Sequence, residues 1–159
     1  MLERLRRFRR LNAEERGIFL RAVFLLPVIS LSLKIRGFRA TQEFLLRFLP
    51  NAQPVSQNAS LLLRRDIERI EITERMVNSA VCHVWRGSNC LQRSLALWWL
   101  LRLQGLSSEL RIGARKINGK FEAHAWVERQ GVALNDPDQQ HRHYATFDAA
   151  FPLQNSEIL

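Results

Sequence analysis

The spacing of apolar residues in this chain changes at Gly105, and that change limits the folds open to it. Before Gly105, the segments 61–84 and 90–104 carry apolar residues at the intervals of helices that bury one face. After it, apolar and polar residues alternate, and Asn118-Gly119 is a strong signal for a two-residue hairpin turn. We therefore expect an α+β fold in which helices precede an antiparallel sheet.

The sheet is predicted to be a meander of three strands. The first two, 110–114 and 121–128, flank the Asn-Gly turn. Arg129-Gln130-Gly131 predicts a three-residue turn, with Gly131 in the left-handed conformation, before a third strand over 132–135.

The N-terminal part is predicted to be helical. Asn12 and Glu15 have the spacing of a capping box and start a helix that Pro27 is expected to bend or break. A second helix is expected to end at Gly37, and a short third helix to cover 41–49.

A length of 159 residues suits one hydrophobic core, so we expect a single domain over 1–159. The polar segment 51–60 separates a helical N-terminal part, 1–50, from a catalytic core, 60–159. The N-terminal helices are expected to pack on this core.

The formal net charge of +9 favours anionic partners without choosing among them. The apolar stretch 18–35 is interrupted by Arg21, Pro27 and Lys34, and is shorter than the roughly 20 residues that cross a bilayer. Two cysteines do not make a disulfide framework, which favours a reducing compartment. We expect a cytoplasmic protein that also associates with a membrane surface.

Cys90 is the first candidate for chemistry. With Asn89 as N-cap and Gln92 completing a capping box, Cys90 becomes the first residue of a helix. The backbone N–H groups there favour a thiolate and can hold an oxyanion. The alternative is a small, inert, apolar residue at a helix start, and Cys82 is read in that way.

His124 and Asp136 are the second and third candidates. The three-residue turn pairs Glu128 with Val132, so His124 on its strand faces Asp136, and the carboxylate can orient the imidazole. A register shifted by one residue turns Asp136 to the other face, so Asp138 remains an alternative. A structural hydrogen bond between the histidine and the aspartate is the competing interpretation.

His141 and His143 form an HxH pair in a polar segment, which we interpret as part of a loop. No third ligand is apparent, so neither a metal nor another cofactor is expected.

The order of Cys, His and Asp resembles the transglutaminase-like branch of papain-like enzymes. Three segments, Cys90–Leu97, Leu110–Arg115 and Ala123–Glu128, are more closely similar to the lasso-peptide leader peptidase family. This resemblance implies a papain/transglutaminase-like core and a stand-alone cysteine peptidase that removes the leader from a ribosomally made precursor.

By position, the resemblance makes Cys90 the nucleophile, His124 the general base and acid, and Asp136 the residue that orients the histidine. It implies the precursor leader peptide as substrate and a separate leader-recognition protein as partner, with the lasso cyclase as a further candidate.

Two rival functions remain open. A transglutaminase-like acyl transferase would use the same three residues. A basic nucleic-acid or membrane-binding module would use Cys90 and His124 only structurally, but the sequence has no basic-aromatic motif for nucleic acid, and no nucleic acid is expected.

The N-terminal part has more apolar residues than one amphipathic helix needs. We expect it to leave an exposed apolar patch that docks the leader-presenting partner or a membrane surface. The alternative is that all of these side chains are buried core.

Overall fold

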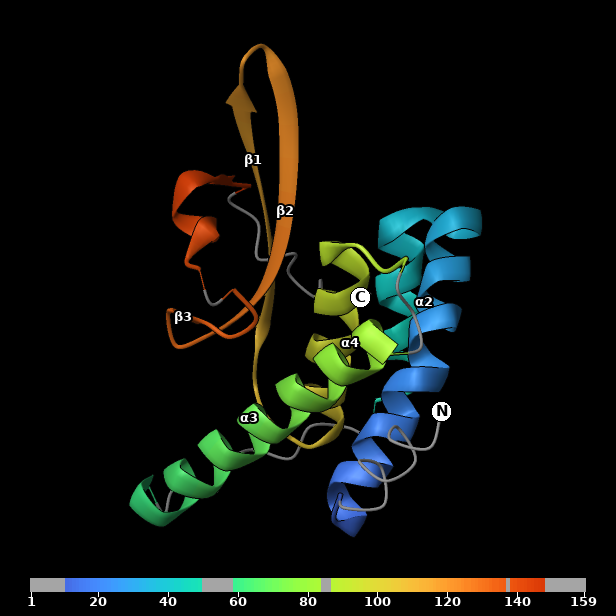
Figure 1. Ribbon diagram of the computed structural model, residues 1–159, viewed down its shortest axis with the longest axis vertical. Helices are drawn as coiled ribbons and strands as arrows, with labels where there is room; N and C mark the ends of the chain where they lie inside the picture. Colours follow the sequence, from blue (N-terminus) through green and yellow to red (C-terminus); the bar gives the residue numbers. More distant parts are fainter. Residues whose placement is uncertain (1–10, 50–58, 84–86, 137, 148–159) are drawn as a thin grey trace, which may run out of the picture.

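The structure, a computed structural model, describes residues 11–49, 59–83, 87–136 and 138–147. Three α-helices come first and a four-stranded antiparallel sheet follows, which confirms the expected α+β class (Figure 1). The helices are α2 (Ala13–Leu46), α3 (Ala59–His83) and α4 (Cys90–Leu103). The remaining elements are β1 (Glu109–Ile117), β2 (Lys120–Arg129), β3 (Val132–Ala133), the 3-10 helix η1 (Gln140–His143) and β4 (Ala145–Thr146).

Helix α2 begins at the predicted capping box, with Asn12 and Glu15 bonding each other's backbone N–H groups. The expectation that Pro27 breaks the helix is wrong, since α2 continues through it. Proline costs a helix one hydrogen bond and a steric clash, about 3 kcal/mol. Burial of the neighbouring Leu26 and Ile29 offsets this cost. The helical dihedral angles are interrupted at Gly37, where φ is 74°, which confirms the expected end of a helical segment there.

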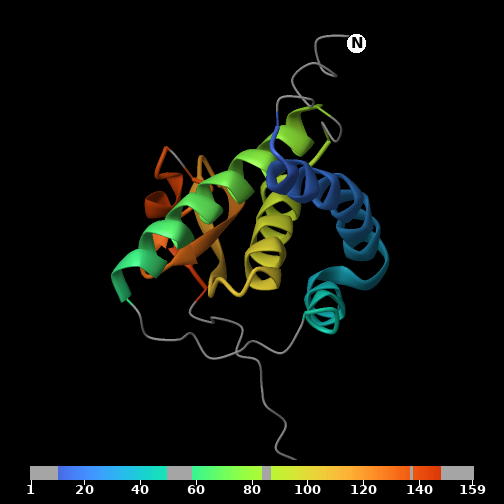
Figure 2. The ribbon, with the colours of Figure 1, turned by 90° about the horizontal axis from the view of Figure 1, so that it is seen from below.

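Helix α4 lies between α2 and the sheet (Figure 2). Helix α3 packs against α2 and α4. One cluster of buried residues joins all three helices to Leu110 of β1 and Val127 of β2. Trp99 adds a polar tie to α2, since its indole Nε1 donates to the Leu45 carbonyl at 2.7 Å. The N-terminal helix is therefore packed on the helix that begins at Cys90.

The sheet has the order β3-β2-β1-β4. The predicted turn at Asn118-Gly119 joins β1 to β2, pairing Ile117 with Lys120. The short strand β4 was not predicted; its two residues pair with β1 at Gly113 and Ala114.

The predicted three-residue turn between β2 and β3 is wrong. Arg129 pairs directly with Val132, so the loop consists of Gln130 and Gly131 alone. Both have positive φ, 52° and 79°, as a tight turn that follows the twist of a hairpin requires. The register along β3 is therefore shifted by one residue from the expected one.

Candidate active site

Cys90 is the first residue of α4, and the expected capping box is present. The Asn89 side chain accepts from the N–H of Gln92 at 2.9 Å, and the Gln92 side chain accepts from the N–H of Asn89 at 3.2 Å. The Gln92 amide also donates to the Ser30 hydroxyl of α2 at 3.1 Å. The start of α4 is thus held by its own cap and by α2, and the Cys90 side chain is half-buried there.

His124 on β2 and Asp136 after β3 come together. His124 Nε2 lies 3.6 Å from Asp136 Oδ1, and their side chains are 12% and 5% exposed. At this distance the contact is an ion pair if the ring is protonated, slightly long for a hydrogen bond. Since Nε2 faces the carboxylate, Nδ1 is the ring atom available to exchange a proton with another group.

Asp136 reaches His124 by a different route from the one predicted. After Ala133 the regular pairing of β3 ends. The N–H of Leu134 still donates to the Val127 carbonyl, but the N–H of Val127 donates to the side chain of Asn135 at 2.8 Å. The Asn135 side chain thus takes the place of a backbone carbonyl as the acceptor for Val127, and the backbone pairing between β2 and β3 ends before Asp136. The alternative residue, Asp138, is exposed.

Asn135 also ties the sheet to α4. Its Nδ2 donates to the Ser94 hydroxyl at 2.8 Å, and that hydroxyl donates to the Ala125 carbonyl at 2.9 Å. Ser94 and Asn135 are 0% and 2% exposed, so loss of either partner would leave buried polar groups unsatisfied.

This network also relates Cys90 to His124. Cys90 stands one helical turn before Ser94, and residues four apart share a helix face. Ser94 contacts Ala125, the residue after His124. Cys90 is therefore on the same face of α4 as Ser94, which contacts β2 at the residue that follows His124. Among the described residues, no hydrogen bond joins the Cys90 thiol to His124; such contacts are often long before a substrate binds.

His141, which was expected only as a loop residue, contributes to the site. It is no mere loop residue: its backbone N–H and its Nδ1 lie 2.6 and 2.7 Å from Asp136 Oδ2. Asp136 Oδ2 is thus held by His141, while Oδ1 faces His124. The five-residue spacing of an aspartate and a histidine was the available signal. Within the described ranges, no three His, Cys, Asp or Glu side chains group as a metal site would require.

The charges of the pair follow from these contacts. Burial lowers the pKa of His124 below its ordinary value of 6.5, and the Asp136 carboxylate opposes that shift without cancelling it. Burial acts to raise the pKa of Asp136, but hydrogen bonds from the backbone and side chain of His141 outweigh it and leave the pKa lowered. Asp136 is therefore ionised at neutral pH.

Aromatic rings enclose the imidazole of His124. The Trp126 ring stacks with it at a centroid distance of 5.9 Å, and the Tyr144 ring lies at 5.3 Å. Gly113 permits this packing, because a Cβ there would stand 2.8 Å from the Tyr144 Cβ and 3.2 Å from the Trp126 ring.

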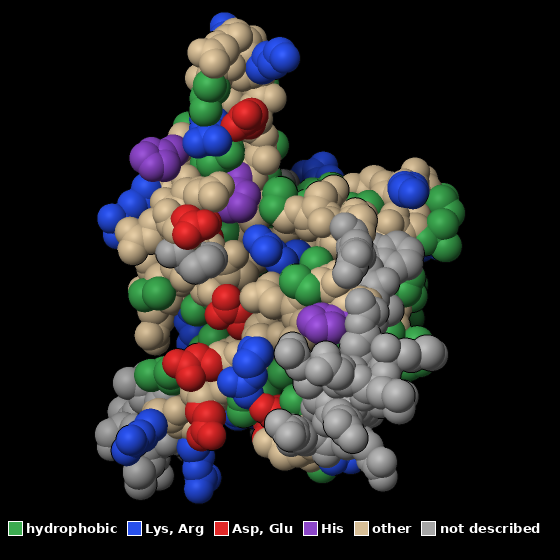
Figure 3. All heavy atoms as spheres, in the orientation of Figure 1, with side chains coloured by type: hydrophobic (Ala, Val, Ile, Leu, Met, Phe, Trp, Pro, Cys, Tyr) green, Lys and Arg blue, Asp and Glu red, His purple; other side chains and the backbone are tan. Residues whose placement is uncertain are grey.

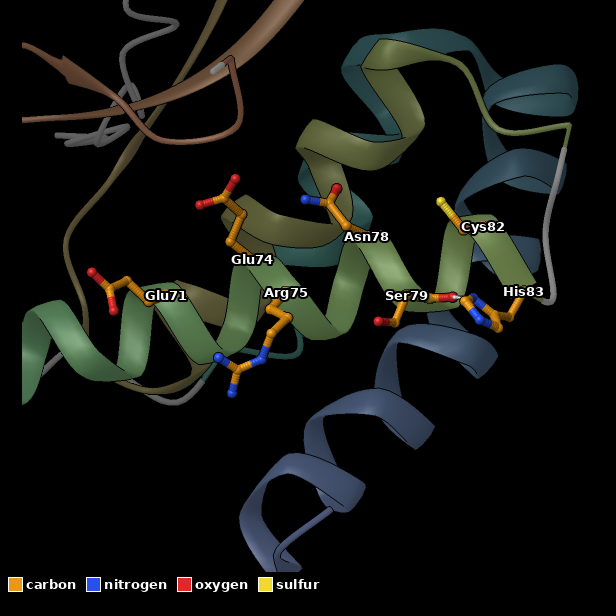
Figure 4. A pocket seen from close by; sticks show the side chains of 7 residues that line it. All are labelled: Glu71, Glu74, Arg75, Asn78, Ser79, Cys82 and His83. Atoms are coloured by element: carbon orange, nitrogen blue, oxygen red, sulfur yellow. Dashed lines mark hydrogen bonds between the residues drawn. The ribbon is translucent and has the colours of Figure 1, made fainter. Parts of the chain in front are cut away.

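A cavity of about 450 Å³ opens along α3, apart from the His124–Asp136 pair (Figure 4). Its lining residues are Glu71, Glu74, Arg75, Asn78, Ser79, Cys82 and His83. Burial raises the pKa of Glu74, and the charge of Arg93 on α4 opposes this shift. The charge of the same arginine also acts to lower the pKa of His124.

Cys82 is exposed on the wall of this cavity, and its interpretation as an inert residue stays a prediction. Neither Cys82 nor Cys90 is in a disulfide.

A family model described as Transglutaminase-like superfamily matches residues 29–147, a range that includes Cys90, His124 and Asp136. No curated protein and no solved structure matches the chain.

Proposed function

The chain belongs to the transglutaminase-like superfamily, which includes cysteine peptidases and acyltransferases, and we propose that it is a cysteine peptidase. In this proposal Cys90 is the nucleophile, His124 the general base and acid, and Asp136 the residue that orients the histidine. The observation that carries it is the approach of His124 Nε2 to within 3.6 Å of a buried aspartate, on a strand that packs against the helix beginning at Cys90.

The chemistry follows from these groups. Neutral His124 takes the proton of the Cys90 thiol, the resulting thiolate attacks the peptide carbonyl, and the carbonyl oxygen becomes an oxyanion. Asn89 accepts from the N–H groups of Gln92 and Arg93, so those of Cys90 and Leu91 are the first-turn donors that the cap leaves for this oxyanion. Protonated His124 gives its proton to the departing amine as the carbon–nitrogen bond breaks.

The acyl-enzyme is then hydrolysed. Neutral His124 takes a proton from water, whose oxygen attacks the thioester carbon, and the cysteine sulfur leaves as the acid product forms. Asp136, kept ionised by His141, stabilises the imidazolium at both stages.

We further propose that the substrate is a lasso-peptide precursor and that the cut removes its leader. The similarity of Cys90–Leu97, Leu110–Arg115 and Ala123–Glu128 to the leader peptidases of that pathway supports this choice. A separate leader-recognition protein would present the precursor, and the lasso cyclase would act on the product.

The test is incubation of the full-length protein with precursor peptides encoded near it, with and without a candidate recognition protein, followed by mass spectrometry. The expected products are the free leader acid and the core peptide, with no cleavage by Cys90→Ala and cleavage retained by Cys82→Ala. Formation of a leader amide with an added amine, without the leader acid, would instead identify an acyl transferase. Absence of any acyl chemistry with an active recognition partner would overturn the proposal.

A further inference from the structure

One face of α2 is apolar and exposed. Its residues recur at intervals of three or four along the helix, which places them in one stripe. This apolar stripe consists of Leu20, Phe24, Val28, Leu31 and Ile35, which are 45%, 71%, 45%, 60% and 72% exposed. In Figure 3, hydrophobic side chains lie along the edge of the molecule that α2 forms. The stripe is longer than the scattered apolar residues of an ordinary soluble surface.

The opposite face of α2 is committed to the core. Ala22, Leu26 and Ile29 are completely buried, and Ser30 accepts from Gln92 of α4. By length and composition α2 is the one helix, among the described residues, that could cross a membrane. If α2 crossed a membrane, it would lose its contacts with α4. If α2 lay in the plane of a bilayer, the apolar stripe would be buried in lipid and the contacts with α4 would remain.

The charges around the stripe suit an anionic surface. The sequence from residue 16 to residue 42 contains no Asp or Glu. Arg21 follows Leu20 and Lys34 precedes Ile35, so these exposed cations stand on opposite edges of the stripe. Long basic side chains in this position can reach lipid headgroups while apolar neighbours enter the acyl boundary.

More basic residues flank the apolar stripe in the sequence. Arg36 and Arg39 are exposed near Gly37. The sequence preceding the helix contains Arg4, Arg6, Arg7, Arg9 and Arg10. Each Lys or Arg near an anionic bilayer contributes about 1 kcal/mol of attraction.

We infer that α2 docks the folded protein in the plane of an anionic phospholipid bilayer through its apolar stripe. The sheet stands on the far side of α4 from α2, so the His124 region would face away from the lipid (Figure 2). The inference concerns a surface, and does not depend on the chemistry at Cys90.

Flotation of the full-length protein with vesicles tests it. We expect binding to vesicles of phosphatidylcholine mixed with phosphatidylglycerol, at least about tenfold weaker binding to phosphatidylcholine alone, and loss of affinity in high salt. The double variant Phe24→Gln/Ile35→Gln should bind at least about tenfold more weakly, since each side chain would lose its burial in lipid. Phe121→Gln is the matched control, because Phe121 is 79% exposed on the hairpin and should not affect binding.

A second variant, Arg21→Gln/Lys34→Gln, leaves the stripe intact and should weaken binding only to the anionic vesicles. Circular dichroism verifies that both double variants fold. Cys90→Ala should bind vesicles like the unmodified protein, which keeps this test separate from that of the peptidase. The inference is overturned if folded wild type ignores anionic vesicles, or if the Phe24/Ile35 variant binds as well as Phe121→Gln. It is also overturned if light scattering shows that the stripe pairs two copies of the chain in place of lipid.

Discussion

His141 holds the carboxylate of Asp136 with two groups at once, its backbone N–H and its ring Nδ1, both directed at Oδ2. The other oxygen, Oδ1, is left facing Nε2 of His124. A carboxylate held at one oxygen cannot rotate freely, so the direction in which it faces the imidazole depends on a residue in η1.

His141→Ala should therefore reduce kcat while leaving KM nearly unchanged. The ring supplies one hydrogen bond to a charged group, worth about 1.5–3 kcal/mol, so we expect a loss of about ten- to hundredfold. His141→Asn, which can place an amide donor near the position of Nδ1, should recover much of it. Equal losses in both variants, or a change confined to KM, would contradict a positioning role; steady-state kinetics on a precursor peptide provides the measurement.

Asp136→Asn should lower turnover by about four orders of magnitude, as when a catalytic histidine loses its orienting charge, with the fold retained. Asp138→Asn should have little effect because that side chain is exposed. Single-turnover cleavage assays on both variants compare them directly. If Asp138→Asn proves the more damaging, the proposed assignment of the aspartate is wrong.

Alkylation tests the relation between Cys90 and His124. Iodoacetamide reacts with the thiolate, which an adjacent imidazolium favours. In a Cys82→Ser background, where the exposed second cysteine is removed, His124→Gln should slow labelling of Cys90 at neutral pH by about tenfold or more. Intact-mass spectrometry follows the rate. An unchanged rate would mean that His124 does not act on this thiol.

Gly113→Ala should destabilise the protein by about 1–3 kcal/mol, because its Cβ would stand 2.8 Å from the Cβ of Tyr144. The control is Gly17→Ala in α2, where an added Cβ meets nothing within 4 Å and alanine is the better helix former. Urea denaturation monitored by circular dichroism should separate the two, with Gly17→Ala equal to or more stable than the wild type. If the Gly113→Ala variant is as stable as the wild type, the prediction is wrong, and the chain at Tyr144 and Ala145 can move to make room for the added Cβ at little cost in free energy.

The lowered pKa of His124 predicts a pH dependence of stability. A histidine whose folded-state pKa is depressed binds fewer protons in the folded than in the unfolded chain. Its contribution is complete above the ordinary value of 6.5 and is lost as the pH falls from there through the lower folded-state value. His124→Gln should remove the part of the loss of stability at low pH that protonation of His124 causes. Melting temperatures from pH 8 to 5 check it, and parallel curves for the two proteins would refute it.

Much of this architecture could be predicted because local signals and tertiary contacts agree. Asn89 and Gln92 specify the start of α4 by themselves, and Asn118-Gly119 supplies both positive φ angles of its turn. The turn after β2 could not be predicted, because Gln130 adopts a φ of 52° that its residue type disfavours.

The position of Asp136 near His124 was expected for a reason that is wrong. The expectation that it lies near His124 rested on a sheet register that is wrong. The two residues meet because Asn135 ends the ladder with its side chain, a contact with Val127 that no local periodicity encodes. In the same way, Pro27 remains helical because the burial of Leu26 and Ile29 outweighs a local preference.

The continuation of α2 through Pro27 has a consequence for any attempt to shorten this protein. The recognisable family similarity starts at residue 29, in the middle of that helix. A chain trimmed to that point would lose the cap at Asn12 and the buried Ile18, Ala22 and Leu26, and would open the helical layer beside α4 to water. The segment that folds together is thus longer than residues 29–147, which the family model matches, and a shortened protein should keep α2 from its first residue.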